Sequence, residues 1–159
     1  MKEYLTKVEA LRESIPEIAI TSDIICGFPG ETERDFEQTL KVMKKISFDG
    51  LFSFKYSKRP QTLASQLPDQ VPEGIKTKRL GRLQMLQNDI STQLNSRLTG
   101  TVQPLLIDGT SKKALGKLTG RTRTNKVANL TGPSDLIGKT VKVKIIRSKP
   151  FDLEAEMVK

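Results

Sequence analysis

The chain has 159 residues, of which 36% are hydrophobic and 28% charged, so it is neither a disordered polymer nor too short to fold as one large domain or two small ones. Its one cysteine excludes an internal disulfide and cannot by itself hold a zinc site or an iron–sulfur cluster, and the lack of a signal peptide or a long apolar run predicts a cytosolic protein. The net charge of +9 favours a polyanionic partner, and it is uneven: residues 1–96 carry 14 basic and 13 acidic residues, whereas residues 97–159 carry 13 and 5.

The amino-terminal part has the pattern of an α/β fold. Apolar residues at helical spacing predict a helix over Glu3–Ser14. A buried strand is expected over Ile18–Cys26, and a Phe-Pro-Gly-Glu turn separates it from a helix that opens with the capping-box-like pair Thr32 and Asp35. A second strand is expected over Leu51–Tyr56. This order of elements is a βαβ unit, so the two strands should be parallel.

The parallel arrangement brings Gly27–Glu31 beside Tyr56–Thr62 at the carboxyl ends of the two strands. Ligands bind at this end of α/β sheets because backbone amides and helix N-termini point there. Asp23 is an ionisable group in an otherwise apolar strand, which is costly unless the group is paired or faces a site. On these grounds the turn at Gly27–Glu31 can equally well be a purely structural turn or part of a ligand site. Arg59 in the second loop is either a solvated arginine or an anion contact.

A long helix is predicted from Glu73 to about Arg97, after the extended linker Pro68–Pro72, and it should bridge two modules. The residues expected to form its buried stripe are Ile75, Leu80, Leu83, Leu86, Ile90 and Leu94. Its basic residues are interpreted as a solvated face in preference to a polyanion contact. They are Lys76, Lys78, Arg79 and Arg82.

After Thr101 the pattern changes to short strands separated by glycine turns. The expected strands are Val102–Ile107, Leu115–Thr119, Lys126–Leu130, Thr140–Ile146 and Phe151–Met157. They predict a small, closed, five-stranded antiparallel barrel of OB-like size. The segment Thr119–Lys126 is basic and rich in hydroxyls, and Lys142 and Lys144 should project from one face of their strand. A small barrel with one basic face is typical of nucleic-acid binding. The alternative, that the lysines only keep the barrel soluble, would explain their alternation but not the charge excess of residues 97–159.

Three stretches of the sequence carry a resemblance to a known family. They are Asp23–Thr32, Phe54–Thr62, and Gly120–Val127 together with Leu136–Lys139. In this order they are similar to the carboxyl-terminal half of the radical S-adenosylmethionine methylthiotransferases, and most similar to the members that modify tRNA. The resemblance extends over essentially the whole chain. It implies that residues 1–70 are the last portion of a partial radical S-adenosylmethionine (β/α)6 barrel, residues 71–97 a linking helix, and residues 98–159 a TRAM domain, the RNA-binding barrel of this family.

The resemblance also implies what this sequence lacks. The family holds a 4Fe–4S cluster on a Cys-x3-Cys-x2-Cys motif that cleaves S-adenosylmethionine, and a second cluster in an amino-terminal domain; neither cysteine set is present here. We therefore expect a fragment that ligates neither cluster and is inactive alone. Cys26 is expected to be a buried strand thiol. The family loop usually reads Arg-Pro-Gly-Thr, whereas this chain has Gln61 in place of the glycine. The difference bears on the geometry of this turn.

Roles for single residues follow from the same resemblance. Those implied to bind S-adenosylmethionine are Ile25, Gly27, Phe28, Glu31, Phe54, Tyr56 and Arg59. Of these, Arg59 would contact an anion, either the cofactor's carboxylate or a tRNA phosphate. Those implied to bind tRNA are Arg121, Arg123, Asn125, Lys126, Lys142 and Lys144. No catalytic residue and no metal ligand is expected in this chain.

The function that the resemblance implies is the addition of a methylthio group to carbon 2 of an N6-isopentenyladenosine next to the anticodon of tRNA. One alternative is a family member that modifies a ribosomal protein, which the strongly basic barrel disfavours. A second alternative, from a different class, is a non-catalytic RNA-binding module attached to a truncated α/β scaffold.

Overall fold

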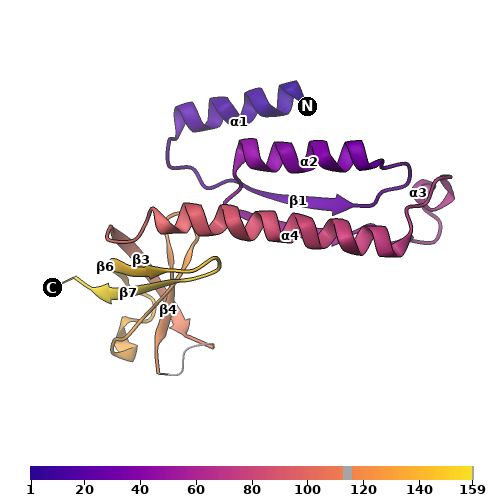
Figure 1. Cartoon of the computed structure of the whole chain (residues 1–159). Coiled ribbons are helices and arrows are strands. Elements are labelled where there is room, and N and C mark those ends of the chain that lie inside the picture. Colours follow the sequence, from indigo (N-terminus) through magenta and orange to yellow (C-terminus); the bar gives the residue numbers. More distant parts are fainter. Residues whose placement is uncertain (113–115, 159) are drawn as a thin grey trace. The chain divides into compact units, whose positions relative to one another are not determined.

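The computed structural model describes residues 1–112 and 116–158, and the chain divides into two compact units. The first unit contains Met1–Ala10 and Ile20–Ile90, and the second contains Leu11–Ala19 and the chain from Ser91 onward. The helices are α1 (Lys2–Ser14), α2 (Glu33–Ile46), α3 (Leu63–Gln66), α4 (Glu73–Ser96) and the 3-10 helix η1 (Ser134–Leu136). The strands are β1 (Thr21–Cys26), β2 (Gly50–Lys55), β3 (Val102–Thr110), β4 (Leu118–Thr122), β5 (Val127–Leu130), β6 (Thr140–Ser148) and β7 (Leu153–Met157) (Figure 1).

The first unit is built on the predicted βαβ motif. Strands β1 and β2 pair in parallel, and α2 connects them. The predicted capping box is confirmed: the Thr32 hydroxyl accepts from the Asp35 amide at 3.2 Å, and the Asp35 carboxylate accepts from the Thr32 amide at 3.0 Å. The apolar stripe of α2 is buried, and with Phe48 it forms the core of this unit. Its members are Phe36, Leu40, Met43 and Ile46.

Helix α4 lies where the sequence predicts a helix, but its buried stripe is different. Of the six apolar residues predicted to form that stripe, Leu83 and Ile90 are buried, whereas Ile75 is exposed. The stripe is completed by polar residues, namely Lys76, Arg79, Gln87, Ser91 and Asn95. The expectation of a solvated basic face is therefore wrong for Lys76 and Arg79, whose aliphatic stems can be covered while their charged ends are bonded.

The second unit contains a closed barrel with the strand order β3-β4-β5-β7-β6. The prediction of an antiparallel barrel is wrong at one interface, because β5 and β7 pair in parallel. A closed ring with an odd number of strands cannot alternate direction all the way round, so at least one pair must be parallel. The barrel is mixed for this reason. The other four interfaces are antiparallel.

The barrel core is apolar, and its members come from every strand. They are Leu105, Ile107, Leu118, Ala128, Leu130, Val143, Ile145, Leu153 and Ala155. Leu115, which was predicted to begin the second barrel strand, lies outside the described residues. Phe151 was predicted to begin the last strand, but it lies in the β6–β7 turn, where the Lys149 amide donates to the Asp152 carbonyl at 2.8 Å.

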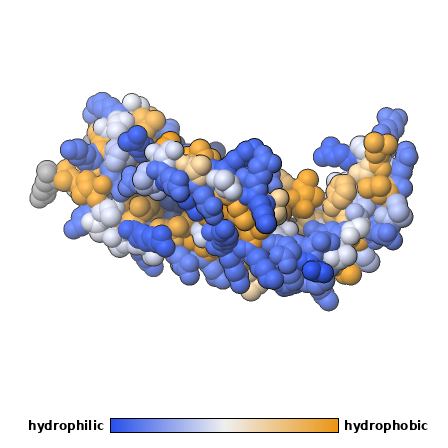
Figure 2. All heavy atoms as spheres, turned by 90° about the horizontal axis from the view of Figure 1, so that it is seen from above, coloured by the Kyte–Doolittle hydropathy of each residue, from blue (hydrophilic) through white to orange (hydrophobic). Residues whose placement is uncertain are grey.

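The surface carries apolar side chains among the polar ones. Figure 2 shows hydrophobic residues between hydrophilic residues on the face in view. Large apolar side chains that are more than half exposed include Ile25, Phe52, Phe54, Val102 and Phe151. None of the described helices has the length and apolar character needed to cross a membrane.

Candidate functional site

One face of the two-stranded sheet is open and largely apolar. The register places Asp23 opposite Phe52 and Ile25 opposite Phe54, and these four residues alternate with the half-buried ones along each strand. Ile25 is 57% exposed, Phe52 65% and Phe54 53%. Large apolar side chains on one face of a sheet are normally covered. This open face is therefore a candidate for covering by the apolar part of a ligand or by another part of the complete fold. Asp23 lies on the same face and is exposed, so it carries no burial cost.

The loops that follow the two strands meet, as the parallel arrangement predicts. The Tyr56 amide donates to the Cys26 carbonyl at 2.8 Å, and the rings of Phe28 and Tyr56 form an edge-to-face contact with centroids 5.2 Å apart. Lys76 from α4 completes the group: its Nζ donates to the Tyr56 carbonyl at 3.1 Å and lies 5.5 Å from the Tyr56 ring centroid. Two predicted residues and one unexpected lysine thus form one packed cluster.

Gly27 and Glu31 have partners within the first unit. Gly27 has a φ of +76°, which favours glycine, and a Cβ there would collide with the Lys76 side chain. Glu31 accepts from the Gly27 amide at 2.7 Å and pairs with Arg79 at 2.7 Å. The exposed fractions of these two side chains are 14% for Glu31 and 6% for Arg79, so the pair is largely buried. These contacts account for both predicted residues as supports of the turn.

A second arginine extends this network at the surface. Arg82 pairs with Glu33 at 2.6 Å and also with Glu37, and Arg79 contacts Glu33 at 3.3 Å. Both guanidinium groups lie over the Phe36 ring, 5.5 Å from its centroid for Arg79 and 5.1 Å for Arg82. The hydrogen bond from Arg82 lowers the pKa of the Glu33 carboxyl, and the bond to Glu37 raises the pKa of Arg82. The charges of α4 therefore stabilise the turn before α2.

Cys26 is a buried thiol, as predicted. Its Sγ lies 3.8 Å from the Lys76 carbonyl oxygen, and burial, with a smaller contribution from Glu31, raises the thiol pKa. A raised pKa keeps the group protonated and weakly reactive. Within the described parts of the chain, no three cysteine, aspartate or glutamate side chains come together as a metal site requires.

The loop after β2 is exposed. Arg59 lies on this loop, and its backbone carbonyl accepts from the amide and the hydroxyl of Thr62, which caps the short helix α3 that the sequence did not predict. Its side chain has no ion pair among the described residues. Gln61 has a φ of +66°, in the left-handed region that favours glycine, which is the usual residue of the family loop at this position.

The β4–β5 turn holds one predicted RNA-binding group in place and leaves another free. Arg121 lies 3.5 Å from Asp108 and donates to the Asn125 carbonyl at 3.3 Å. The turn is closed by the Lys126 amide, which donates to the Thr122 hydroxyl at 3.1 Å. Arg123 lies at the exposed tip and makes no ion pair with any described residue.

Lys142 and Lys144 project from the outer face of β6, as the alternation predicts. They lie opposite Pro104 and Val102 of β3 in the strand register, and both are exposed. Neither forms an ion pair or side-chain hydrogen bond among the described residues. Two free lysines on a strand face, with Arg123 on the nearby turn of the same barrel, are suited to contact a phosphate backbone.

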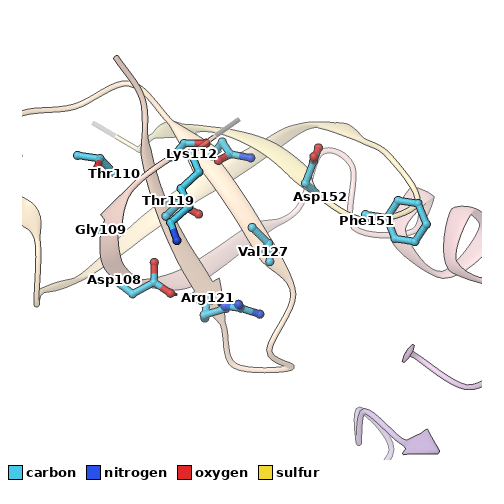
Figure 3. Close-up of a pocket in the computed structure, with 11 residues that line it drawn as sticks. Asp108, Gly109, Thr110, Lys112, Thr119, Arg121, Val127, Phe151 and Asp152 are labelled. Carbon is cyan, nitrogen blue, oxygen red and sulfur yellow. Dashed lines mark ion pairs between the residues drawn. The ribbon is translucent and has the colours of Figure 1, made fainter. Parts of the chain in front are cut away.

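Sequence reasoning missed a groove on the outer face of β3, β4 and β5. It is lined by Arg121, Lys112 and Phe151 (Figure 3) and also by Asn129. Of these, only Arg121 was predicted as a site residue. The signal available in the sequence was Phe151, an aromatic residue after Lys149-Pro150 in a basic segment. That residue was assigned to a strand, and its exposure was therefore not foreseen.

The comparisons with known proteins agree with this division of the chain. Residues 96–158 match the family described as TRAM domain, so the barrel of the second unit is a TRAM domain. The whole chain is similar to proteins named tRNA-2-methylthio-N(6)-dimethylallyladenosine synthase. It is 50% identical to that of Carboxydothermus hydrogenoformans over 98% of this chain and 35% of the relative. The identity is 46% to those of Syntrophobacter fumaroxidans and Aquifex aeolicus, over 99% of this chain and 34% and 35% of the relatives.

The chain thus spans about a third of the length of the curated relatives it matches. The resemblance to the carboxyl-terminal part of the tRNA methylthiotransferases is confirmed, although the share is a third and not a half.

Proposed function

We propose that this chain is the part of a tRNA methylthiotransferase that holds the RNA and forms one side of the cofactor pocket. The reaction of the whole enzyme would add a methylthio group to carbon 2 of N6-isopentenyladenosine next to the anticodon. The observation that carries the proposal is the 46–50% identity, over nearly the entire chain, to relatives named for this product.

The RNA partner is the anticodon stem-loop, and the TRAM domain holds it. Residues 97–159 carry 13 basic and 5 acidic residues, and Arg123, Lys142 and Lys144 have no ion-pair partner among the described residues. Free cations on one small barrel attract phosphates and release counterions when they bind, so affinity should depend strongly on salt. Arg121, Asn125 and Lys126 shape the turn that presents Arg123.

In this proposal residues 1–70 are the last part of a (β/α)6 barrel, and the open sheet face lines the site of S-adenosylmethionine. The face fits that role, since Ile25 and Phe54 offer exposed apolar surface at the carboxyl ends of parallel strands. When bound, the cofactor would supply the radical that activates the unreactive carbon. Ile25 and Phe54 would cover its adenine and exclude water, while the Glu31–Arg79 pair would hold the adjoining turn in shape.

The described residues do not fit an iron–sulfur cluster. The single thiol, Cys26, is buried in the first unit and has no neighbouring cysteine. The two 4Fe–4S clusters of the proposed enzyme would therefore be ligated elsewhere in the complete polypeptide, and this chain alone would be inactive. We place the enzyme in the cytoplasm, where tRNA is modified.

A chimera tests the proposal. The chain would replace the matching third of the Carboxydothermus hydrogenoformans relative, and the hybrid would be produced in cells that lack their own enzyme. Mass spectrometry of tRNA nucleosides should detect the methylthio group with the hybrid and not with the chain alone. A folded hybrid that retains its clusters and leaves isopentenyladenosine unmodified would overturn the proposal.

A further inference from the structure

The groove on the outer face of the barrel has the size and lining of a small-ligand site. Its volume is about 550 Å³, within the range of pockets that hold a nucleotide-sized molecule. The strand register sets Thr119 opposite Asn129 and Arg121 opposite Val127, so side chains from β4 and β5 form its floor. The β6–β7 turn contributes Phe151 and Asp152. In Figure 3, Phe151 lies at the edge of the group and Val127 toward its middle.

Phe151 is exposed, and the backbone of the turn that carries it is held in place by hydrogen bonds. The side chain is 68% exposed, which is unusual for a phenylalanine. Its turn is closed by the hydrogen bond from the Lys149 amide to the Asp152 carbonyl at 2.8 Å. The buried Asn95 side chain also donates to the carbonyls of Lys149 and Pro150, at 2.8 and 3.2 Å. These bonds fix the backbone that carries the ring, so a flat partner that stacks on Phe151 would have to order only its side chain.

Asn129 supplies a second, independent feature. The residue is 9% exposed and lines the groove, yet none of the described residues forms a hydrogen bond with its side-chain amide. Its amide atoms are not among the fully enclosed, unpartnered side-chain atoms of the described residues, so they reach the open groove, where a ligand can take the place of water. An amide carries both donors and acceptors, so it matches the mixed edge of a nucleobase.

The charges of the groove argue against a simple phosphate pocket. Lys112 and Arg121 are offset by Asp108 and Asp152, and Arg121 lies 3.5 Å from Asp108. A balanced lining with one aromatic ring and one unpaired amide suits an uncharged flat group with a polar edge. The free cations that attract phosphates, Lys142 and Lys144, do not line this groove.

We propose that the groove binds a single unpaired nucleobase of the RNA, which stacks on Phe151 and pairs its polar edge with Asn129. The inference rests on the proposed RNA-binding function and adds which feature of the RNA is recognised. Proteins read unpaired RNA by stacking bases on aromatic side chains and bonding their edges, whereas paired bases offer no free face.

The test measures binding of the full chain by fluorescence anisotropy to three RNAs: a short unstructured strand, the duplex of the same sequence, and the same strand with abasic sites. Phe151→Ala should weaken binding of the unstructured strand about tenfold, and Phe151→Tyr should keep it. Neither variant should change affinity for the duplex or the abasic strand by more than about twofold. The control is Ile137→Ala, because Ile137 is also an exposed apolar residue but lies outside the groove.

Two outcomes separate the groove from the wider proposal. If the wild-type chain binds RNA and Phe151→Ala binds the unstructured strand equally well, the groove is not a base site and the RNA-binding proposal stands. If the wild-type chain binds none of the three RNAs even at low salt, the RNA-binding proposal itself fails and the inference fails with it.

Discussion

The two units use their basic side chains in opposite ways. In the first unit, Lys76 and Arg79 are buried and bonded to groups of the same unit, including the Tyr56 carbonyl and the Glu31 carboxylate. In the TRAM domain the core is entirely apolar, and Lys142 and Lys144 lie on the outer face without partners among the described residues. Buried basic residues thus stabilise the fold in the first unit, whereas Lys142 and Lys144 remain available to a ligand in the second.

The difference shows why a count of charges must be read together with geometry. Residues 1–96 carry one more basic residue than the TRAM-domain half, 14 against 13, yet most of those on α4 pair with glutamates. The excess in residues 97–159 comes from having fewer acidic residues, 5 against 13, and Arg123, Lys142 and Lys144 form no ion pair with any described residue. A polyanion site requires unpaired cations, and the barrel supplies them.

The largest predicted effect comes from breaking the buried pair of the first unit. Arg79→Ala leaves the Glu31 carboxylate without its partner in a largely buried position, and it should destabilise this unit by about 3 kcal/mol. Urea unfolding followed by circular dichroism measures the change.

Arg82→Ala is the matched control for that variant, because Arg82 also pairs with Glu33 and lies over Phe36 but is 45% exposed. Exposed pairs contribute less, so it should cost under about 1 kcal/mol. If the two variants lost equal free energy of unfolding, the burial of Arg79 would not be the cause of its larger expected contribution to stability.

The stability of the barrel should instead fall when a side chain is added where two of its strands lie close together. A Cβ at Gly120 would overlap the Leu106 carbonyl oxygen of the neighbouring strand, and Gly120→Ala should therefore cost about 1–3 kcal/mol. Gly109→Ala is the control on β3, since a Cβ there meets no atom within 4 Å. Thermal unfolding of both variants provides the measurement, and a neutral Gly120→Ala would contradict the described register.

The smallest predicted effect is the change in the free energy of unfolding when the unpaired cations of the TRAM domain are replaced. The triple variant Arg123→Gln, Lys142→Gln and Lys144→Gln should change the free energy of unfolding by less than about 0.5 kcal/mol, because these side chains form no ion pair with described residues. A loss as large as that of Arg79→Ala would mean that the barrel, like the first unit, depends on its basic residues.

Local patterns predicted the elements of both units well. The period of two located the barrel strands, and Thr32 with Asp35 located the start of α2, because these features depend on neighbours in sequence. The face of β6 that carries Lys142 and Lys144 also followed from alternation alone.

Features set by distant parts of the chain could not be predicted in this way. The buried stripe of α4 contains Lys76 and Arg79 because their partners, Tyr56 and Glu31, come from other elements. The groove was missed because Phe151 is kept out of the strand by a turn that Asn95 anchors from the end of α4. Helical spacing and strand propensity depend only on residues close in sequence, so they cannot predict contacts between distant elements.

The central claim is that the free cations of the TRAM domain hold RNA. The most direct measurement is the slope of the logarithm of affinity for an anticodon stem-loop against the logarithm of salt concentration, with the full chain. The Arg123, Lys142 and Lys144 triple glutamine variant should lower the magnitude of that slope by about two, one counterion being released for roughly each phosphate contact. The matched control removes the same charge from the first unit, as Lys41→Gln, Lys44→Gln and Lys78→Gln, and should leave the slope unchanged. Equal slopes for the wild type and the TRAM-domain variant would contradict the account.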